Sequence, residues 1–154
     1  MNTTLLLSKT INLLTPAMHA AKRGAVNACV LSLLEGANAC VTGIGRGIAS
    51  SAYEKHSIKR ADRLLSNPRL QCEVPGIYAA ISHLFVSASK RPVIHIDWSD
   101  LDAYGRYFLI RASVAFDGRS ITLYEEVHDI NTKEKPATHK RFLRTLKQIG
   151  REHV

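Results

Sequence analysis

The sequence predicts an α+β fold, in which helices come first and a short run of antiparallel strands and one more helix follow. Three observations lead to this prediction. Apolar residues recur at helical spacing before residue 90, β-branched segments replace them after Pro92, and helical spacing returns after Pro136. We therefore expect two domains, an all-α domain at residues 1–89 and a strand-containing domain at residues 90–154.

Several helices are expected in the first domain, because apolar side chains recur there at positions i, i+4 and i+7. Pro16 and Gly36 punctuate the first two helices, and Pro68 ends a shorter one. The expected core faces are Leu7, Ile11 and Leu14; Val26, Val30 and Leu33; and Ile77, Ile81 and Leu84.

The second domain is expected to begin with a three-stranded meander. The segments VIHIDW (93–98), YFLIRASVAF (107–116) and RSITLYEEV (119–127) are short and rich in β-branched and aromatic residues. Asp117-Gly118 separates the last two segments and is a strong hairpin signal. After Pro136, Phe142, Leu146 and Ile149 share one face of a predicted helix.

Charge is the clearest compositional signal. The formal net charge is +8, and residues 1–70 hold 9 Lys+Arg against 3 Asp+Glu. An excess of this kind favours a polyanionic partner, most often nucleic acid. Three cysteines without a C-x-x-C pair argue against a disulfide framework or a zinc site and fit a reducing cytosol. No segment reaches the about 18 apolar residues that a membrane span needs.

The segment CVTGIGRGIASSAY (40–53) resembles a dinucleotide-binding loop in its glycine spacing. Such a loop must follow a buried strand and open a helix, with an acidic residue about 20 positions later. Asp62 has nearly that offset, but it lies in a basic helical segment, and no parallel βαβ repeat surrounds the glycines. We interpret the segment as a turn and short helix of a DNA-binding unit. Its glycines serve either helix turns or close backbone approach to phosphates.

A basic helix is predicted directly after this segment, in YEKHSIKRADRLLSNP. Ser57 is a candidate N-cap. Ile58, Ala61 and Leu65 form an apolar face, whereas Lys55, Lys59 and Arg63 recur on another side, with Arg60 beside them. Such a helix can bury one face and offer the other to phosphates, and we favour DNA contact over an ordinary solvated face.

Asp97 is the strongest candidate for chemistry. It lies inside an apolar strand and alternates with Val93 and His95. Ionised carboxylates in apolar surroundings usually have a partner or a metal, and nucleases hold two Mg²⁺ ions with carboxylates on rigid strands. The pattern alone favours a structural role for Asp97, either as a strand-end cap or in a pair with Arg111 on the neighbouring strand. Glu125 and Glu126 are interpreted as exposed charges at a strand end.

Four segments together resemble one known family. KHSIKRADRLLSNPRL, PVIHIDWSDL, IRASVAFDGRSITLYEEVH and HKRFLRTL occur in this order. They are similar to the N-terminal part of bacterial insertion-sequence transposases of the cut-and-paste DDE type, the insertion-sequence-four family. The resemblance runs from about Leu31 to Ile149.

The resemblance implies a helical domain that binds the terminal inverted repeats of the transposon in double-stranded DNA. It also implies an RNase H-like domain with three carboxylates that bind Mg²⁺, of which Asp97 matches the first, as both a catalytic and a metal-binding residue. The residues that it assigns to DNA-end binding are Lys55, His56, Lys59, Arg60 and Arg63, and we add Arg46 as a further candidate.

The second catalytic aspartate and the glutamate of the family are expected beyond the helix that HKRFLRTL resembles. We therefore expect a truncated transposase with an incomplete RNase H-like domain, which binds DNA without catalysis on its own. A non-catalytic DNA-binding module or an inhibitor of transposition is the alternative. The expected partners of the chain are DNA and either a full-length transposase or a second copy of the chain. The expected location is the bacterial cytoplasm, and the nucleoid when the chain is bound to DNA.

Overall fold

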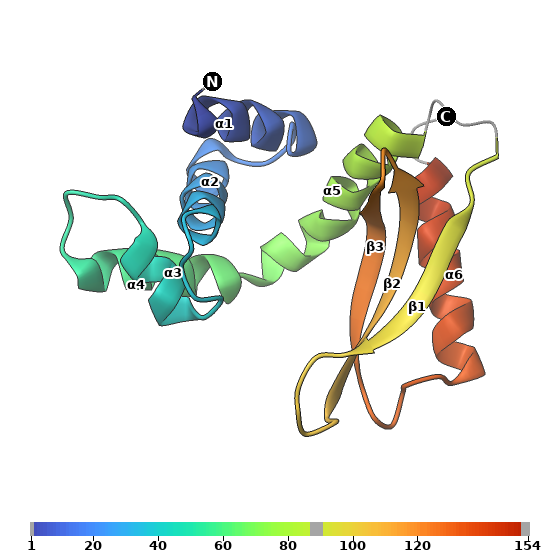
Figure 1. Ribbon diagram of the computed structural model, residues 1–154. Coiled ribbons are helices and arrows are strands. Elements are labelled where there is room, and N and C mark those ends of the chain that lie inside the picture. The colour runs from blue at the N-terminus through green and yellow to red at the C-terminus, as the bar shows by residue number, and fades with distance from the viewer. Residues whose placement is uncertain (1, 87–90, 152–154) are drawn as a thin grey trace. The chain divides into compact units, whose positions relative to one another are not determined.

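The computed structural model describes residues 2–86 and 91–151. Within these ranges the chain forms six helices and one three-stranded antiparallel sheet, which confirms the α+β prediction (Figure 1). The chain divides into two compact units, unit 1 at Met1–Val74 and unit 2 at Pro75–Val154. The predicted domain boundary, between residues 89 and 90, lies outside the described residues.

Unit 1 is all-α. It contains α1 (Thr3–Leu14), α2 (Ala20–Leu34), α3 (Val41–Gly47), α4 (Glu54–Leu65) and the first turns of α5 (Pro68–Val86). Its core consists of Cys29, Ile44, Ile48, Ala61 and Leu64. No helix in the described part of the chain is long and apolar enough to cross a membrane.

Small side chains, rather than the predicted large ones, occupy the most buried positions of α2. Cys29 and Ser32 are buried there, whereas Leu33 of the predicted face is 39% exposed. The Ser32 hydroxyl donates a 2.8 Å hydrogen bond to the Ile44 carbonyl of α3. A small polar side chain therefore lets α3 come close to α2 while satisfying a buried carbonyl group.

The glycines of α3 make the same close packing possible. A Cβ atom on Gly45 would overlap the backbone of Ile58 in α4, and a Cβ atom on Gly47 would overlap the Ser32 hydroxyl. From the sequence, these glycines could serve either helix turns or close backbone approach to phosphates. In the structure, Gly45 and Gly47 lie inside α3, at its contacts with α4 and α2. Because glycine costs about 1 kcal/mol per residue in a helix interior, α3 depends on this packing for its stability.

Unit 2 combines the sheet with α6 (Pro136–Arg151) and the later part of α5. The strands β1 (Ile94–Asp100), β2 (Tyr107–Phe116) and β3 (Arg119–Asp129) form a meander in the order β1-β2-β3. The hairpin predicted at Asp117-Gly118 is confirmed, since both residues have positive φ values, 47° and 70°. Among the described strands, β1 pairs only with β2, so its outer edge has no strand partner.

The predicted apolar face of α6 packs on one face of the sheet. Phe142 is fully buried against Ile110 and Ala112 of β2, and its ring stacks on Tyr124 of β3 at 5.1 Å. Leu146 packs at the border of the same cluster. Figure 1 shows α6 running along the sheet in unit 2. This packing leaves the opposite side of α6 exposed to solvent.

Within α5, Pro75 interrupts the helical hydrogen-bond ladder, because proline has no N–H group to donate. The division between the two units falls at this residue. In the part of α5 that belongs to unit 2, Tyr78 makes an edge contact with Tyr124 at 5.4 Å, and Phe85 does so with Phe116 at 5.2 Å. These aromatic contacts hold α5 to the sheet.

Replacing Gly45 with alanine should destabilise unit 1 by about 1–3 kcal/mol, because the new methyl group overlaps the α4 backbone, which cannot move as freely as a side chain. Urea unfolding followed by circular dichroism measures this loss. Gly24→Ala is the matched control in α2, since the nearest atom to its Cβ is 3.8 Å away. The control should be neutral or stabilising by up to about 1 kcal/mol. Equal effects of the two substitutions would contradict the packing role of Gly45.

Candidate nucleic-acid interface

The helix predicted to bind DNA is α4, but it begins earlier and buries a different face than expected. It starts at Glu54, with Tyr53 in the cap position and no side-chain cap, so the assignment of Ser57 as N-cap is wrong. Ser57 is buried within the helix together with Ala61 and Leu64. Leu65, predicted to be part of the apolar face, is 47% exposed.

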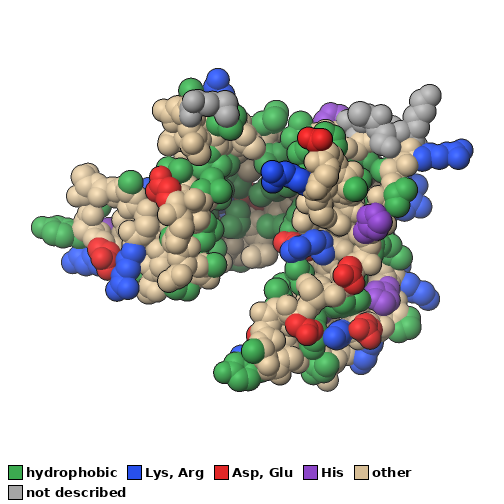
Figure 2. Space-filling model, viewed as in Figure 1, with side chains coloured by type: hydrophobic (Ala, Val, Ile, Leu, Met, Phe, Trp, Pro, Cys, Tyr) green, Lys and Arg blue, Asp and Glu red, His purple; other side chains and the backbone are tan. Residues whose placement is uncertain are grey.

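The five basic residues predicted on α4 all lie on its exposed side. At 100° per residue they cover an arc of about 140°, opposite the buried face. They are Lys55, His56, Lys59, Arg60 and Arg63, and together we call them the α4 surface. Figure 2 shows Lys and Arg side chains, with an acidic side chain among them, over the part of unit 1 where α3 and α4 lie.

Partners within unit 1 distinguish these residues from one another. Lys59 Nζ lies 3.2 Å from Asp62 Oδ2, and Arg60 donates a 2.8 Å hydrogen bond to the Gly24 carbonyl of α2. Among the described residues, Lys55 and Arg63 have no ion-pair partner. Lys55 and Arg63 are therefore the residues most available to phosphates, whereas Arg60 also helps to hold α4 against α2.

Arg46 lies on α3, separate from the α4 surface in sequence, and its Nε is 3.0 Å from the Glu54 carboxylate at the start of α4. Both side chains are more than 60% exposed. An exposed pair of this kind contributes little to stability and can open when a phosphate competes for the guanidinium group. Arg46 can therefore extend the α4 surface only by exchanging partners.

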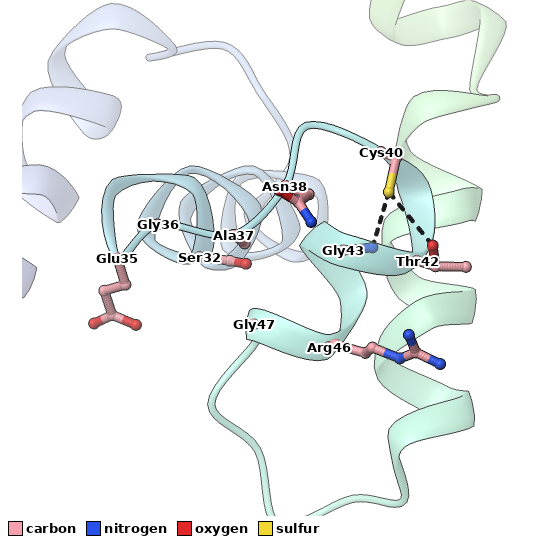
Figure 3. Close-up of a pocket in the computed structure, with 10 residues that line it drawn as sticks. All are labelled: Ser32, Glu35, Gly36, Ala37, Asn38, Cys40, Thr42, Gly43, Arg46 and Gly47. Atoms are coloured by element: carbon pink, nitrogen blue, oxygen red, sulfur yellow. Dashed lines mark hydrogen bonds between the residues drawn. The ribbon is translucent and has the colours of Figure 1, made fainter.

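A groove between α2 and α3 adjoins Arg46 and has a volume of about 550 Å³. Figure 3 shows Cys40 on its wall, where the Gly43 N–H donates to Cys40 Sγ at 3.3 Å and Thr42 Oγ1 lies 3.4 Å from the sulfur. The hydrogen bond with the Thr42 side chain, followed by that from Gly43, lowers the pKa of the Cys40 thiol. In sequence the cysteines fit no disulfide, zinc or nucleophile pattern, so nothing there singled out the Cys40 thiol.

Asp97 lies on β1, but its environment is not the apolar one that was predicted. Its side chain is exposed, and Oδ1 accepts a 2.8 Å hydrogen bond from the Trp98 N–H. Arg111 is its register partner on β2, yet the Arg111 Nε pairs with Glu125 at 2.9 Å instead. The reason is that β1 is an edge strand whose buried contact, through Trp98, lies on the other face of the sheet.

The carboxylates do not gather around Asp97. Nowhere in residues 2–86 and 91–151 do three or more His, Cys, Asp or Glu side chains form a group that could hold a metal ion. The residue opposite Asp97 in the sheet is a cation, which repels a metal ion. The described residues therefore do not fit a site for two Mg²⁺ ions, which needs several carboxylates converging on it.

Glu126 was interpreted as an exposed charge at a strand end, and this interpretation is wrong. Its side chain is 15% exposed and accepts hydrogen bonds from Tyr124 at 2.7 Å and from Arg141 of α6 at 3.1 Å, and its other contact is His128 at 2.9 Å. Burial alone would raise the pKa of the Glu126 carboxyl. The hydrogen bonds from Tyr124, Arg141 and His128 outweigh burial and lower that pKa.

A second polar contact ties β1 to α6. The Trp98 indole N–H donates a 2.9 Å hydrogen bond to His139 Nε2, and the Trp98 ring makes an edge contact with His128 at 5.5 Å. In sequence, the histidines showed no metal-ligand spacing. The sheet and α6 bring His128 and His139 together around Trp98, and their role is to hold the strand that carries Asp97.

Replacing Glu126 with glutamine should lower the free energy of unfolding of unit 2 by about 1–3 kcal/mol at pH 7, since the charged hydrogen bonds to Arg141 and His128 are weakened. The pKa of the Glu126 carboxyl is lowered in the folded state. Its contribution to the free energy of unfolding is therefore fully present above the unfolded pKa, about 4.3, and is lost as pH falls through the folded pKa. The difference in the free energy of unfolding between Glu126→Gln and the parent protein should therefore be smaller at about pH 3 than at pH 7.

Urea unfolding followed by the fluorescence of Trp98, the single tryptophan, measures this difference at each pH. Glu134→Gln is the matched control, since the Glu134 side chain is 66% exposed and lies 3.9 Å from its partner Lys133. A Glu126→Gln difference that is as large at pH 3 as at pH 7 would contradict the assigned role.

Comparison of the chain with protein-family models, with curated proteins and with solved structures found no match.

Proposed function

We propose that this chain binds duplex DNA through the α4 surface and that it is the N-terminal part of a cut-and-paste transposase, with transposon ends as its target. The observation that carries the proposal is the division of α4, which buries Ser57, Ala61 and Leu64 and exposes five basic residues opposite them. Lys55 and Arg63 supply uncompensated charge for the phosphate backbone. The resemblance to insertion-sequence-four transposases supports the choice of transposon ends.

In this proposal Asp97 is the first of the three metal-binding carboxylates of an RNase H-like domain, and Mg²⁺ is the metal. The described residues contribute Asp97 alone to such a site, so the remaining carboxylates must come from outside them. This chain on its own is then a DNA-binding protein without strand cleavage, located in the bacterial cytoplasm and at the nucleoid when bound.

A non-catalytic DNA-binding module or transposition inhibitor is the second candidate. It is favoured by the surroundings of Asp97, which faces solvent opposite Arg111 and not opposite another carboxylate. Such a protein would occupy transposon ends, or would combine with a full-length transposase or a second copy of itself. Both candidates share the α4 surface and differ only in whether Asp97 is ever used.

Neutralising Lys55 and Arg63 together, as Lys55→Gln with Arg63→Gln, should weaken binding to a duplex of random sequence. It should also flatten the dependence of log K on log salt concentration by about 1.8, because two phosphate contacts are lost. Fluorescence anisotropy over a salt series measures both quantities. Lys9→Gln with Arg119→Gln is the control with the same change in net charge, at exposed positions outside α4. Equal loss in both pairs would mean that only net charge matters.

Recognition of transposon ends requires sequence preference in addition to charge. Selection from a pool of random duplexes should enrich one motif with the parent protein, and the Lys55→Gln, Arg63→Gln variant should bind that motif and a random duplex more weakly to a similar extent, because the contacts it loses are to phosphates. Binding without any enriched motif would refute end recognition and leave only a non-specific DNA-binding protein.

Asp97→Asn should change neither DNA affinity nor stability, because the side chain is exposed and its backbone hydrogen bond can be kept by asparagine. The parent chain should leave supercoiled plasmid intact in the presence of Mg²⁺. Nicking by the parent that disappears in Asp97→Asn would show that this chain is catalytic without further carboxylates, against the proposal.

A further inference from the structure

The exposed side of α6 carries a second concentration of positive charge. The helix has 16 residues, and its sequence PATHKRFLRTLKQIGR contains five Lys and Arg and no Asp or Glu. Four of the five recur at intervals of four, three and four positions, which places them within about 60° of one another around the helix axis. They are Lys140, Arg144, Lys147 and Arg151, and we call them the α6 stripe.

The packing of α6 holds this stripe away from the sheet. Phe142 and Ile149 are buried on the opposite side of the helix, at 0% and 2% exposure. All four residues of the α6 stripe are exposed, and none has an ion-pair partner in the part of the chain that the structure describes. The fifth cation, Arg141, differs in this respect because it donates to Glu126. The stripe is therefore a fixed row of uncompensated cations.

We propose that the α6 stripe is a second nucleic-acid surface, which contacts the phosphate backbone of duplex DNA without reading its sequence. From Lys140 to Arg151 the helix rises about 16 Å, which matches about five phosphates along one strand. An anionic membrane fits less well, since a membrane-binding helix inserts its apolar face. In α6 the residues of that face, Phe142 and Ile149, are already buried in unit 2.

This surface is separate from both parts of the proposed function. It belongs to unit 2, whereas the α4 surface belongs to unit 1. Within unit 2, Trp98 faces α6, and the neighbouring Asp97 therefore points to the other side of the sheet. DNA on the α6 stripe would lie across the sheet from Asp97, so the stripe serves as an additional attachment and does not deliver DNA to that carboxylate.

A purely structural role for these cations makes a different prediction. Positive charges in the last turn of a helix stabilise it by about 0.3–1 kcal/mol through its dipole. If that were their only role, neutralising them would lower the stability of unit 2 and leave DNA affinity unchanged. The experiment must therefore record stability and binding on the same variants.

The test compares the parent chain with a variant that combines Lys140→Gln, Arg144→Gln and Lys147→Gln. Binding to a 30-base-pair duplex of random sequence is measured by anisotropy between about 50 and 200 mM salt. We expect weaker binding and a salt dependence flatter by about 2.7, with unchanged urea unfolding monitored by Trp98. The matched control combines Lys9→Gln, Arg69→Gln and Arg119→Gln, which are exposed positions outside α4 and α6.

Each outcome decides the proposal. An unchanged salt dependence, or a loss equal to that of the control, overturns it, as does a loss of stability without a change in DNA affinity. Loss of binding to phosphatidylserine vesicles with DNA binding retained would assign the stripe to a membrane instead. The three α6 substitutions are then repeated in the Lys55→Gln, Arg63→Gln background, which separates the two surfaces. A further loss of DNA affinity in that background supports the α6 stripe whether or not the α4 surface binds DNA.

Discussion

The close approach of α3 to α4 at Gly45 is the constraint on which the candidate interface depends. Because Gly45 has no side chain, Ile58 can lie directly against it, and α4 turns the Ser57, Ala61 and Leu64 side into the core. That rotation leaves the basic side of α4 exposed. The glycines that resemble a cofactor loop in sequence therefore set which face of the next helix meets solvent.

In unit 2 the corresponding constraint is that α6 covers one face of a small sheet. Phe142 packs against the apolar residues of β2 and β3 on that face. The Trp98–His139 and Glu126–Arg141 hydrogen bonds pair polar groups around this cluster. Alternation along β1 then sends Asp97 to the other side. The same packing that stabilises unit 2 thus separates its one candidate metal ligand from its most polar cluster.

Charge in this protein divides into compensated and uncompensated groups, and the difference matters more for binding than the total. Arg46, Lys59 and Arg111 have carboxylate partners that a phosphate would have to displace. Within the described ranges, no carboxylate pairs with Lys55, Arg60 or Arg63 of the α4 surface, although Arg60 donates to the Gly24 carbonyl, and none pairs with the four residues of the α6 stripe. Counterion release depends on such free cations. The free cations therefore support the proposed DNA contacts, whereas the carboxylates of the described residues form no group of three or more that could hold a metal ion.

Local patterns were enough to predict much of this structure. The α+β class, the hairpin at Asp117-Gly118, the α6 face containing Phe142 and the exposure of the basic residues of α4 all follow from spacing between near neighbours. The buried face of α4, the setting of Asp97 and the central place of Glu126 do not. They depend on contacts between segments that are distant in sequence. The contacts are Ile58 with Gly45, Arg111 with Glu125, and Arg141 with Glu126. Residue periodicity shows that one side of a helix or strand is apolar, but only tertiary packing decides how closely neighbours approach and which charges find a partner.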